Sequence, residues 1–151
     1  IKTLEEIKVN SVIIYGSGSV VDSLLIALRE LNIENISIIS RNLDTASIKG
    51  KLYGVNVVKK MEEISSEYDL LINATPAPFA GDLKTIADRA NIIFDLVVSS
   101  EDTDIIATTK LQGKAYYTGL EMAKYQFQKQ FQIYTDVEVK KIDIEKIIKI
   151  V

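Results

Sequence analysis

Residues 11–21 (SVIIYGSGSVV) combine a short apolar run with two closely spaced glycines, a pattern that can bind phosphate. Residues 12–15 are uncharged and β-branched or aromatic, as in a parallel strand that is buried on both faces. Gly16 turns the chain, and Gly18 removes the side chain that would hold a ligand away from the backbone. The helix expected over residues 20–31 points its free N–H groups and positive dipole end outward. The stretch therefore predicts a pyrophosphate site in a dinucleotide-binding βαβ unit.

The dinucleotide fingerprint is incomplete in this stretch. Only Gly16 and Gly18 fit the G-x-G-x-x-G pattern, because Val21 occupies the place of the third glycine. An ordinary strand-to-helix loop is therefore the alternative interpretation of these residues.

The end of the second expected strand bears on the choice of cofactor. An NAD-selective site carries an acidic residue there, about 20 residues beyond the glycine turn, to bind the ribose 2′-hydroxyl. This chain has Ser40 and Arg41 at that place. Because an arginine can pair with a 2′-phosphate, the sequence predicts a preference for NADP.

The composition restricts the chemistry that the chain can perform. Its 151 residues are 47% apolar, carry a formal net charge of −3, and include no histidine and no cysteine. This excludes disulfides, thiol nucleophiles, a Ser-His-Asp triad and most zinc sites, so we predict no metal site. No Lys/Arg cluster and no apolar stretch of about 20 residues occurs, which argues against nucleic-acid and membrane partners. The cytoplasm is the expected compartment.

Strand-like and helix-like patterns alternate along the chain. Strands are expected at residues 12–15, 36–39, 54–58, 69–73, 91–94 and 114–117. Helices are expected at residues 20–31, 44–49, 61–66, 102–110 and 119–134, with another beginning at residue 82, and the second of these is expected to close at Gly50. This order predicts a single α/β domain with a doubly wound, mainly parallel six-stranded sheet, and ligands beyond the carboxyl ends of its strands.

Two amphipathic segments flank the expected nucleotide-binding domain, which covers residues 11–135. Residues 1–10 contain an expected lead-in helix, and residues 136–151 an expected tail helix with apolar side chains at i, i+3, i+4 and i+7. Either apolar stripe needs a surface to cover, and we expect the tail helix to pack on a missing N-terminal domain. For the lead-in helix two alternatives stay open: packing on the edge of its own domain, or connection to another domain.

Several separated stretches together resemble the shikimate and quinate dehydrogenases, in the nucleotide-binding domain that is C-terminal in that family. Residues 16–19 (Gly-Ser-Gly-Ser) resemble the family's Gly-Ala-Gly-Gly turn, and residues 40–42 (Ser-Arg-Asn) its Asn-Arg-Thr. Residues 73–76 (Asn-Ala-Thr-Pro) are similar to a family loop of the same letters, and residues 94–97 (Phe-Asp-Leu-Val) to its Val-Asp-x-Val strand end. Residues 119–135 resemble Gly-Leu-x-Met-x-x-x-Gln followed by Phe-x-x-Trp-Thr.

The resemblance implies an oxidoreductase of aromatic amino-acid biosynthesis that reduces 3-dehydroshikimate to shikimate with NADP as its cofactor. It implies a substrate contact by Gln126, and cofactor contacts by a larger set. These are Gly16, Ser17, Gly18, Ser19 and Val20 in the turn, Ser40 and Arg41, then Ala74, Thr75 and Pro76 towards the nicotinamide, with Leu96 and Gly119. In the family a Lys–Asp pair of an N-terminal domain handles the proton, and nothing here matches that domain. No residue of this chain is therefore predicted to be catalytic.

Departures from the family pattern leave two functional interpretations open. Val21 stands where a small residue lets the helix pack closely, and Asp22 where the family carries a basic or neutral residue. A carboxylate in the first helical turn suits the helix dipole but competes with a phosphate. Residues 97–100 (Val-Val-Ser-Ser) lack an aromatic of the family's Val-Tyr-x-Pro. The chain is either part of a divergent enzyme, completed by a missing N-terminal domain or a homodimer, or a non-catalytic NAD(P)-binding or scaffold module.

Single residues also have purely structural alternatives. Arg41 could be a solvated surface arginine, Asp95 could cap the turn after its strand, and Gln126 could be an exposed helix position. Pro76 and Pro78 could shape a loop that binds nothing.

Overall fold

Strands and helices alternate throughout the computed structural model, which describes residues 8–64, 67–76 and 81–138. The strands are β1 (Ser11–Tyr15), β2 (Asn35–Ile39), β3 (Asn56–Val58), β4 (Tyr68–Asn73), β5 (Ala90–Asp95) and β6 (Ala115–Thr118). The helices are α2 (Val20–Glu30), α3 (Leu43–Tyr53), α4 (Gly81–Asp88), α5 (Asp104–Leu111) and α6 (Gly119–Thr135), with a 3-10 turn η1 (Met61–Glu63).

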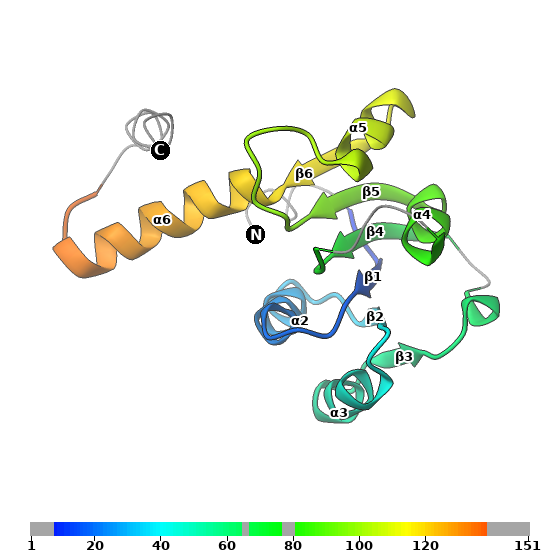
Figure 1. The fold of residues 1–151 in the computed structure, drawn as a ribbon. Helices are drawn as coiled ribbons and strands as arrows, with labels where there is room; N and C mark the ends of the chain where they lie inside the picture. The colour runs from blue at the N-terminus through cyan, green and yellow to red at the C-terminus, as the bar shows by residue number, and fades with distance from the viewer. Residues whose placement is uncertain (1–7, 65–66, 77–80, 139–151) are drawn as a thin grey trace.

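The six strands form one sheet in the order β3-β2-β1-β4-β5-β6, and every neighbouring pair is parallel (Figure 1). β1 is central: Ser11 pairs with Asn35 of β2 on one side, and Val12 pairs with Leu70 of β4 on the other. The chain order reverses between β1 and β4, which is the place where doubly wound sheets bind ligands. The predicted six-stranded α/β fold is confirmed.

Helices cover both faces of the sheet and bury two apolar cores. α2 and α3 lie on one face, and α4 and α5 on the other (Figure 1). Val12 and Ile14 of β1 join the first core while Ile13 joins the second, and all three are fully buried. This explains the continuous apolar run of the first strand. Val21 is also fully buried in the first core, so the valine at the third glycine place is a packing residue.

Two boundaries around α3 differ from the sequence prediction. The helix was expected to close at Gly50, but it continues to Tyr53, and Gly54 ends it in the left-handed region with φ 63°. Gly50 serves close packing instead, because a Cβ there would lie 2.5 Å from Val57 Cγ2 of β3. The third strand consequently begins at Asn56, not at Gly54.

Other predicted helices are shorter or fall outside the described residues. The helix expected at residues 61–66 is a 3-10 turn over Met61–Glu63. The lead-in helix over residues 1–8 and the tail helix within residues 136–151 lie almost wholly outside the described ranges.

α6 differs from the other helices because it runs away from the sheet (Figure 1). It begins with a capping box in which the Thr118 hydroxyl accepts from the Glu121 amide, and of its residues only Gly119 is buried. Phe127, Ile133 and Tyr134 are 41%, 69% and 82% exposed. None of the described helices is long and apolar enough to cross a membrane.

Candidate functional site

A cavity of about 840 Å³ opens at the carboxyl ends of β1, β2 and β4, next to the reversal of strand order. Its lining comes from three places: the end of β1 with the turn after it (Tyr15, Gly16, Ser17 and Gly18), the loop after β2 with the start of α3 (Ser40, Arg41, Asn42, Leu43 and Asp44), and the loop after β4 (Ala74, Thr75 and Pro76). Cavities of roughly 300–1,000 Å³ hold small ligands and cofactors in proteins. The place and size are therefore those of a nucleotide site in this fold class.

Gly16 lets the loop after β1 close against the loop after β4. Its amide donates to the Ile39 carbonyl at 2.8 Å, which extends the β1–β2 pairing beyond the strand. Its φ is 125°, and a Cβ there would lie 2.7 Å from Thr75 Cγ2 and 3.0 Å from the Ala74 carbonyl oxygen. Because both the backbone angle and the space exclude a side chain, only glycine fits this turn.

The start of α2 leaves backbone donors open towards solvent. A Cβ on Gly18 would meet no atom within 4 Å, so the backbone is bare at this point. Ser19 caps α2 without a side-chain hydrogen bond. Within the described part of the chain, the amides of Gly18, Ser19 and Val20 donate to no protein acceptor. Such open donors at the positive end of a helix can bind an anion.

Serine hydroxyls join the two loops that flank the site. Ser17 Oγ and Ser40 Oγ lie 2.8 Å apart, and Ser40 Oγ accepts from the Asn42 amide at 3.1 Å. Asn42 in turn caps α3, because its Oδ1 accepts from the Thr45 amide at 3.0 Å. These bonds fix the loop that carries Arg41. Among the described residues the exposed Arg41 takes part in no ion pair, so its guanidinium is available to a ligand at the cavity rim.

Tyr15 forms part of the cavity from the last position of β1. Burial raises the pKa of its hydroxyl, the negative charge of Asp82 raises it further, and the positive charge of Arg41 opposes the shift. The phenol is therefore neutral at physiological pH, and it can donate a hydrogen bond.

A buried polar network holds the ends of β4 and β5. The Asn73 amide group donates to Asp95 Oδ1 at 2.9 Å, and Asn73 Oδ1 accepts from the Thr75 amide and hydroxyl at 3.2 and 3.0 Å. Thr103 Oγ1 donates to Asp95 Oδ2 at 2.5 Å. Asp95 is only 1% exposed and does not line the cavity. It therefore holds the turn after its strand, which was the alternative to a ligand contact.

Other predicted site residues lie outside the cavity. Ser19 and Val20 begin α2 directly after it. Leu96 and Gly119 follow β5 and β6 and make a close backbone contact there, because a Cβ on Gly119 would lie 2.3 Å from the Leu96 carbonyl oxygen. Gln126 is exposed on α6, about two turns beyond Gly119.

The structure adds four lining residues that the sequence prediction did not include: Tyr15, Asn42, Leu43 and Asp44. Tyr15 and Leu43 directly adjoin predicted motifs, Asn42 belongs to the Ser-Arg-Asn motif, and Asp44 lies two positions after it. Position at the glycine turn or at the second strand end was therefore the available signal. Nothing in the pattern indicated whether their side chains face the cavity.

Comparison with known proteins identifies the relatives of this chain. No family model matches it. The shikimate dehydrogenase-like protein of Haemophilus influenzae is 28% identical over 146 residues, covering 89% of this chain and 53% of that protein. A shikimate dehydrogenase (NADP(+)) of Leptospira interrogans is 30% identical over 157 residues, covering 94% of this chain and 54% of the relative. The chain is a relative of the shikimate dehydrogenases.

The fold agrees with this assignment. A solved structure of a shikimate 5-dehydrogenase-like protein matches 97% of the chain with a TM-score of 0.83 and 25% identity, and the match covers 56% of that structure. The chain therefore spans about half the length of the shikimate dehydrogenases that it matches. The resemblance predicted from the motifs is confirmed.

Proposed function

We propose that this chain is the NADP-binding domain of a shikimate dehydrogenase-like oxidoreductase. The observation that carries the proposal is the cavity itself, which is lined both by the turn before the open N-terminus of α2 and by Arg41, an arginine without an ion pair among the described residues. The two groups suit the two phosphate positions of one ligand. The relation of this chain to the shikimate dehydrogenases, and the NADP(+) in the name of the Leptospira relative, support the same cofactor.

The residues of the cavity fit the parts of the cofactor in order. The amides of Gly18, Ser19 and Val20 would hold the pyrophosphate, with Gly16 and Ser17 shaping the turn. Arg41, held beside Ser40, would pair with the 2′-phosphate.

The opposite side of the cavity would receive the nicotinamide half. The loop of residues 74–76 would direct the nicotinamide towards the contact between Leu96 and Gly119. NADPH supplies the hydride when it is bound, so this domain needs only to bind and orient it.

The reaction that we propose is reduction of 3-dehydroshikimate to shikimate. It requires the reacting carbons within about 3.5 Å of each other and a group that passes a proton to the developing alkoxide. Gln126 is the proposed substrate contact of this chain, and no residue here is assigned as the proton donor. We place that donor in the half of the shikimate dehydrogenase relatives that this chain does not cover. The exposed apolar side chains of α6 are consistent with such a neighbour.

A second candidate is a non-catalytic NAD(P)-binding or scaffold module. The loop after β5 favours it, because residues 97–100 replace an aromatic near the substrate cleft with small and aliphatic side chains. Activity decides between the candidates. We expect no shikimate-dependent NADPH formation by residues 1–151 alone, and activity in a protein extended upstream. Turnover by the chain alone would overturn the two-domain proposal, and an inactive extended protein would favour the module.

Titration with NADP and NAD tests the cofactor assignment directly. A charge-assisted hydrogen bond to phosphate contributes about 1.5–3 kcal/mol, and the lower figure suits an exposed arginine. We therefore expect wild-type chain to prefer NADP by roughly tenfold, and Arg41→Ala to bind the two cofactors about equally. An unchanged NADP:NAD ratio in Arg41→Ala would contradict the assignment of this residue.

A further inference from the structure

Lys49 is a buried cation that lies outside the cavity and pairs with Asp22. It sits in the middle of α3, is 8% exposed, and its Nζ lies 2.5 Å from Asp22 Oδ2. Asp22 belongs to the first turn of α2, the helix whose open amides face the cavity. A buried ammonium is stable only when it is paired and hydrogen-bonded, so this contact is specific.

The pair determines the charge at the start of α2. The pKa of the Asp22 carboxyl lies below its ordinary value, chiefly because of the hydrogen bond from Lys49, with a contribution from Tyr53. Asp22 is thus ionised at neutral pH, and alone it would compete with a phosphate for the positive end of the helix. Lys49 compensates that charge from a neighbouring helix.

The same contact joins the two elements that carry the phosphate-binding groups. α2 begins at the glycine turn, and α3 begins directly after the loop with Arg41 and Asn42. A bond between the first turn of α2 and the middle of α3 fixes the distance between these loops. Ser17 and Ser40 join them a second time at the cavity itself.

We propose that Lys49 is a positioning residue of the cofactor site, which neutralises Asp22 and holds α2 against α3 so that the helix N-terminus is open to phosphate. This inference rests on the proposed function, because it concerns the binding of NADP by the same cavity. It also explains how the chain carries an acid in a phosphate-binding turn.

The test is a double-mutant cycle on NADP binding by the purified chain, measured by calorimetric titration. We expect Lys49→Met to weaken binding about tenfold, since it leaves Asp22 uncompensated. Adding Asp22→Asn to Lys49→Met should restore most of the affinity. The matched control is Lys51→Met, which removes an exposed lysine of the same helix and should change the affinity less than twofold.

Ionic strength separates electrostatics from packing. The gap between wild type and Lys49→Met should narrow from about 20 mM to 500 mM salt, because the Debye length falls over this range. If Lys49→Met does not fold, Lys49→Gln keeps a donor without the charge, and the same loss and rescue are expected of it.

Each alternative result contradicts a different statement. Unchanged affinity in Lys49→Met, or loss without rescue by Asp22→Asn and without salt dependence, would overturn the role of Lys49 while NADP binding by the wild type stands. A wild-type chain that does not bind NADP would overturn the proposed function, and this inference with it.

Discussion

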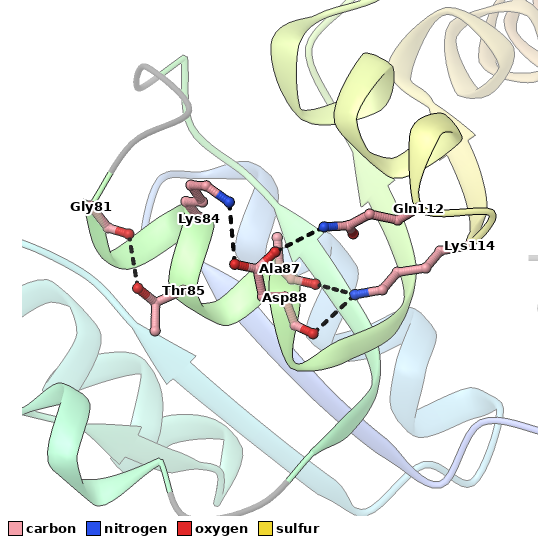
Figure 2. A network of polar contacts seen from close by, with 7 residues as sticks. All are labelled: Gly81, Lys84, Thr85, Ala87, Asp88, Gln112 and Lys114. Atoms are coloured by element: carbon pink, nitrogen blue, oxygen red, sulfur yellow. Dashed lines mark hydrogen bonds and ion pairs between the residues drawn. The ribbon is translucent and has the colours of Figure 1, made fainter.

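Helix ends at the two edges of the sheet are completed by different groups. At the amino edge, cations of the chain itself close the C-termini of α4 and α3: Lys114 Nζ donates to the Ala87 and Asp88 carbonyls at 2.9 and 3.0 Å, and Arg29 Nη2 to the Gly54 carbonyl at 3.0 Å. Figure 2 shows the first of these ends with the side chains around it. At the carboxyl edge, the N-terminus of α2 keeps its donors open.

Carboxylates at the amino edge are likewise occupied. Asp69 Oδ2 accepts from the Asn10 and Ser11 amides at 2.8 and 3.0 Å, which joins the start of β1 to β4. Asp88 accepts from Gln112 at 3.0 Å and Lys84 at 3.2 Å (Figure 2). Helix N-termini at the carboxyl edge are not all alike: side chains cap α3 and α6, whereas the first amides of α2 are left to a ligand. Substitutions at the two edges should therefore affect different measurements.

The largest effect on NADP binding is expected at the carboxyl edge of the sheet, from Gly18→Val. Gly18 does not adopt a positive φ, and a Cβ there meets no protein atom, so the fold should accept valine. The new side chain would occupy the space of the phosphate, and we expect NADP affinity to fall about hundredfold, equivalent to about 2.7 kcal/mol. Thermal unfolding should shift little.

Ile26→Ala, on the exposed side of the same helix, is the control for this variant and should leave the affinity unchanged. An unfolding midpoint that falls in Gly18→Val together with its affinity would break the distinction between the edges.

The next largest effect is expected at the amino edge of the sheet, where Asp69→Ala should lower stability. Two backbone amides lose their acceptor, which should lower the free energy of unfolding by about 1–3 kcal/mol at pH 7 without changing NADP affinity. These amides also hold the pKa of Asp69 below its ordinary value. Its contribution is thus complete above the unfolded pKa of about 3.9 and is lost as pH falls through the lower folded pKa.

Urea unfolding at pH 7 and pH 2.5 measures this contribution. The difference between wild type and Asp69→Ala should shrink at the lower pH, and a constant difference would rule out the ionised carboxylate as its source. Asp102→Ala removes an exposed carboxylate paired with Lys110, and should change stability by less than about 1 kcal/mol.

The smallest effect is expected from Lys114→Met. This change keeps an apolar stem but removes the cation at the end of α4, a contribution of about 0.3–1 kcal/mol. Unfolding in low salt should detect the loss, which high salt should reduce. Weaker NADP binding in this variant would contradict the separation of the two edges, because it would show that the amino edge influences the binding site at the carboxyl edge.

Local patterns predicted the parts of the fold that depend on neighbours in sequence. The glycine turn followed from Gly16 and Gly18, and the central strands from apolar runs such as residues 12–15, because burial on both faces is visible in composition. The boundary at Gly50 was wrong, since its reason is close packing against Val57 and not a helix end. Periodicity alone cannot distinguish these two uses of a glycine.

Contacts between distant residues could not be predicted in the same way. The Ser17–Ser40 and Asp22–Lys49 contacts join residues 23 and 27 positions apart, and no motif relates the members of either pair. Asp22 by itself indicated repulsion of a phosphate, whereas its partner reverses that conclusion. The three-dimensional register of α2 and α3 supplies information that one residue type at one place does not contain.

The strand order also has a consequence for how the molecule folds. Hydrogen-bonded residues of β2 and β3 are 19 positions apart in the sequence, and those of β4 and β5 are 22 apart. Ser11 of β1 and Asp69 of β4, which are also hydrogen-bonded, are 58 positions apart. Closing a longer loop loses more chain entropy, so we expect each half-sheet to form before the seam between β1 and β4. The cavity spans that seam. A partly folded chain with both halves in place would carry the glycine turn and Arg41 on one half and residues 74–76 on the other, so the complete lining of the cavity requires the closed seam.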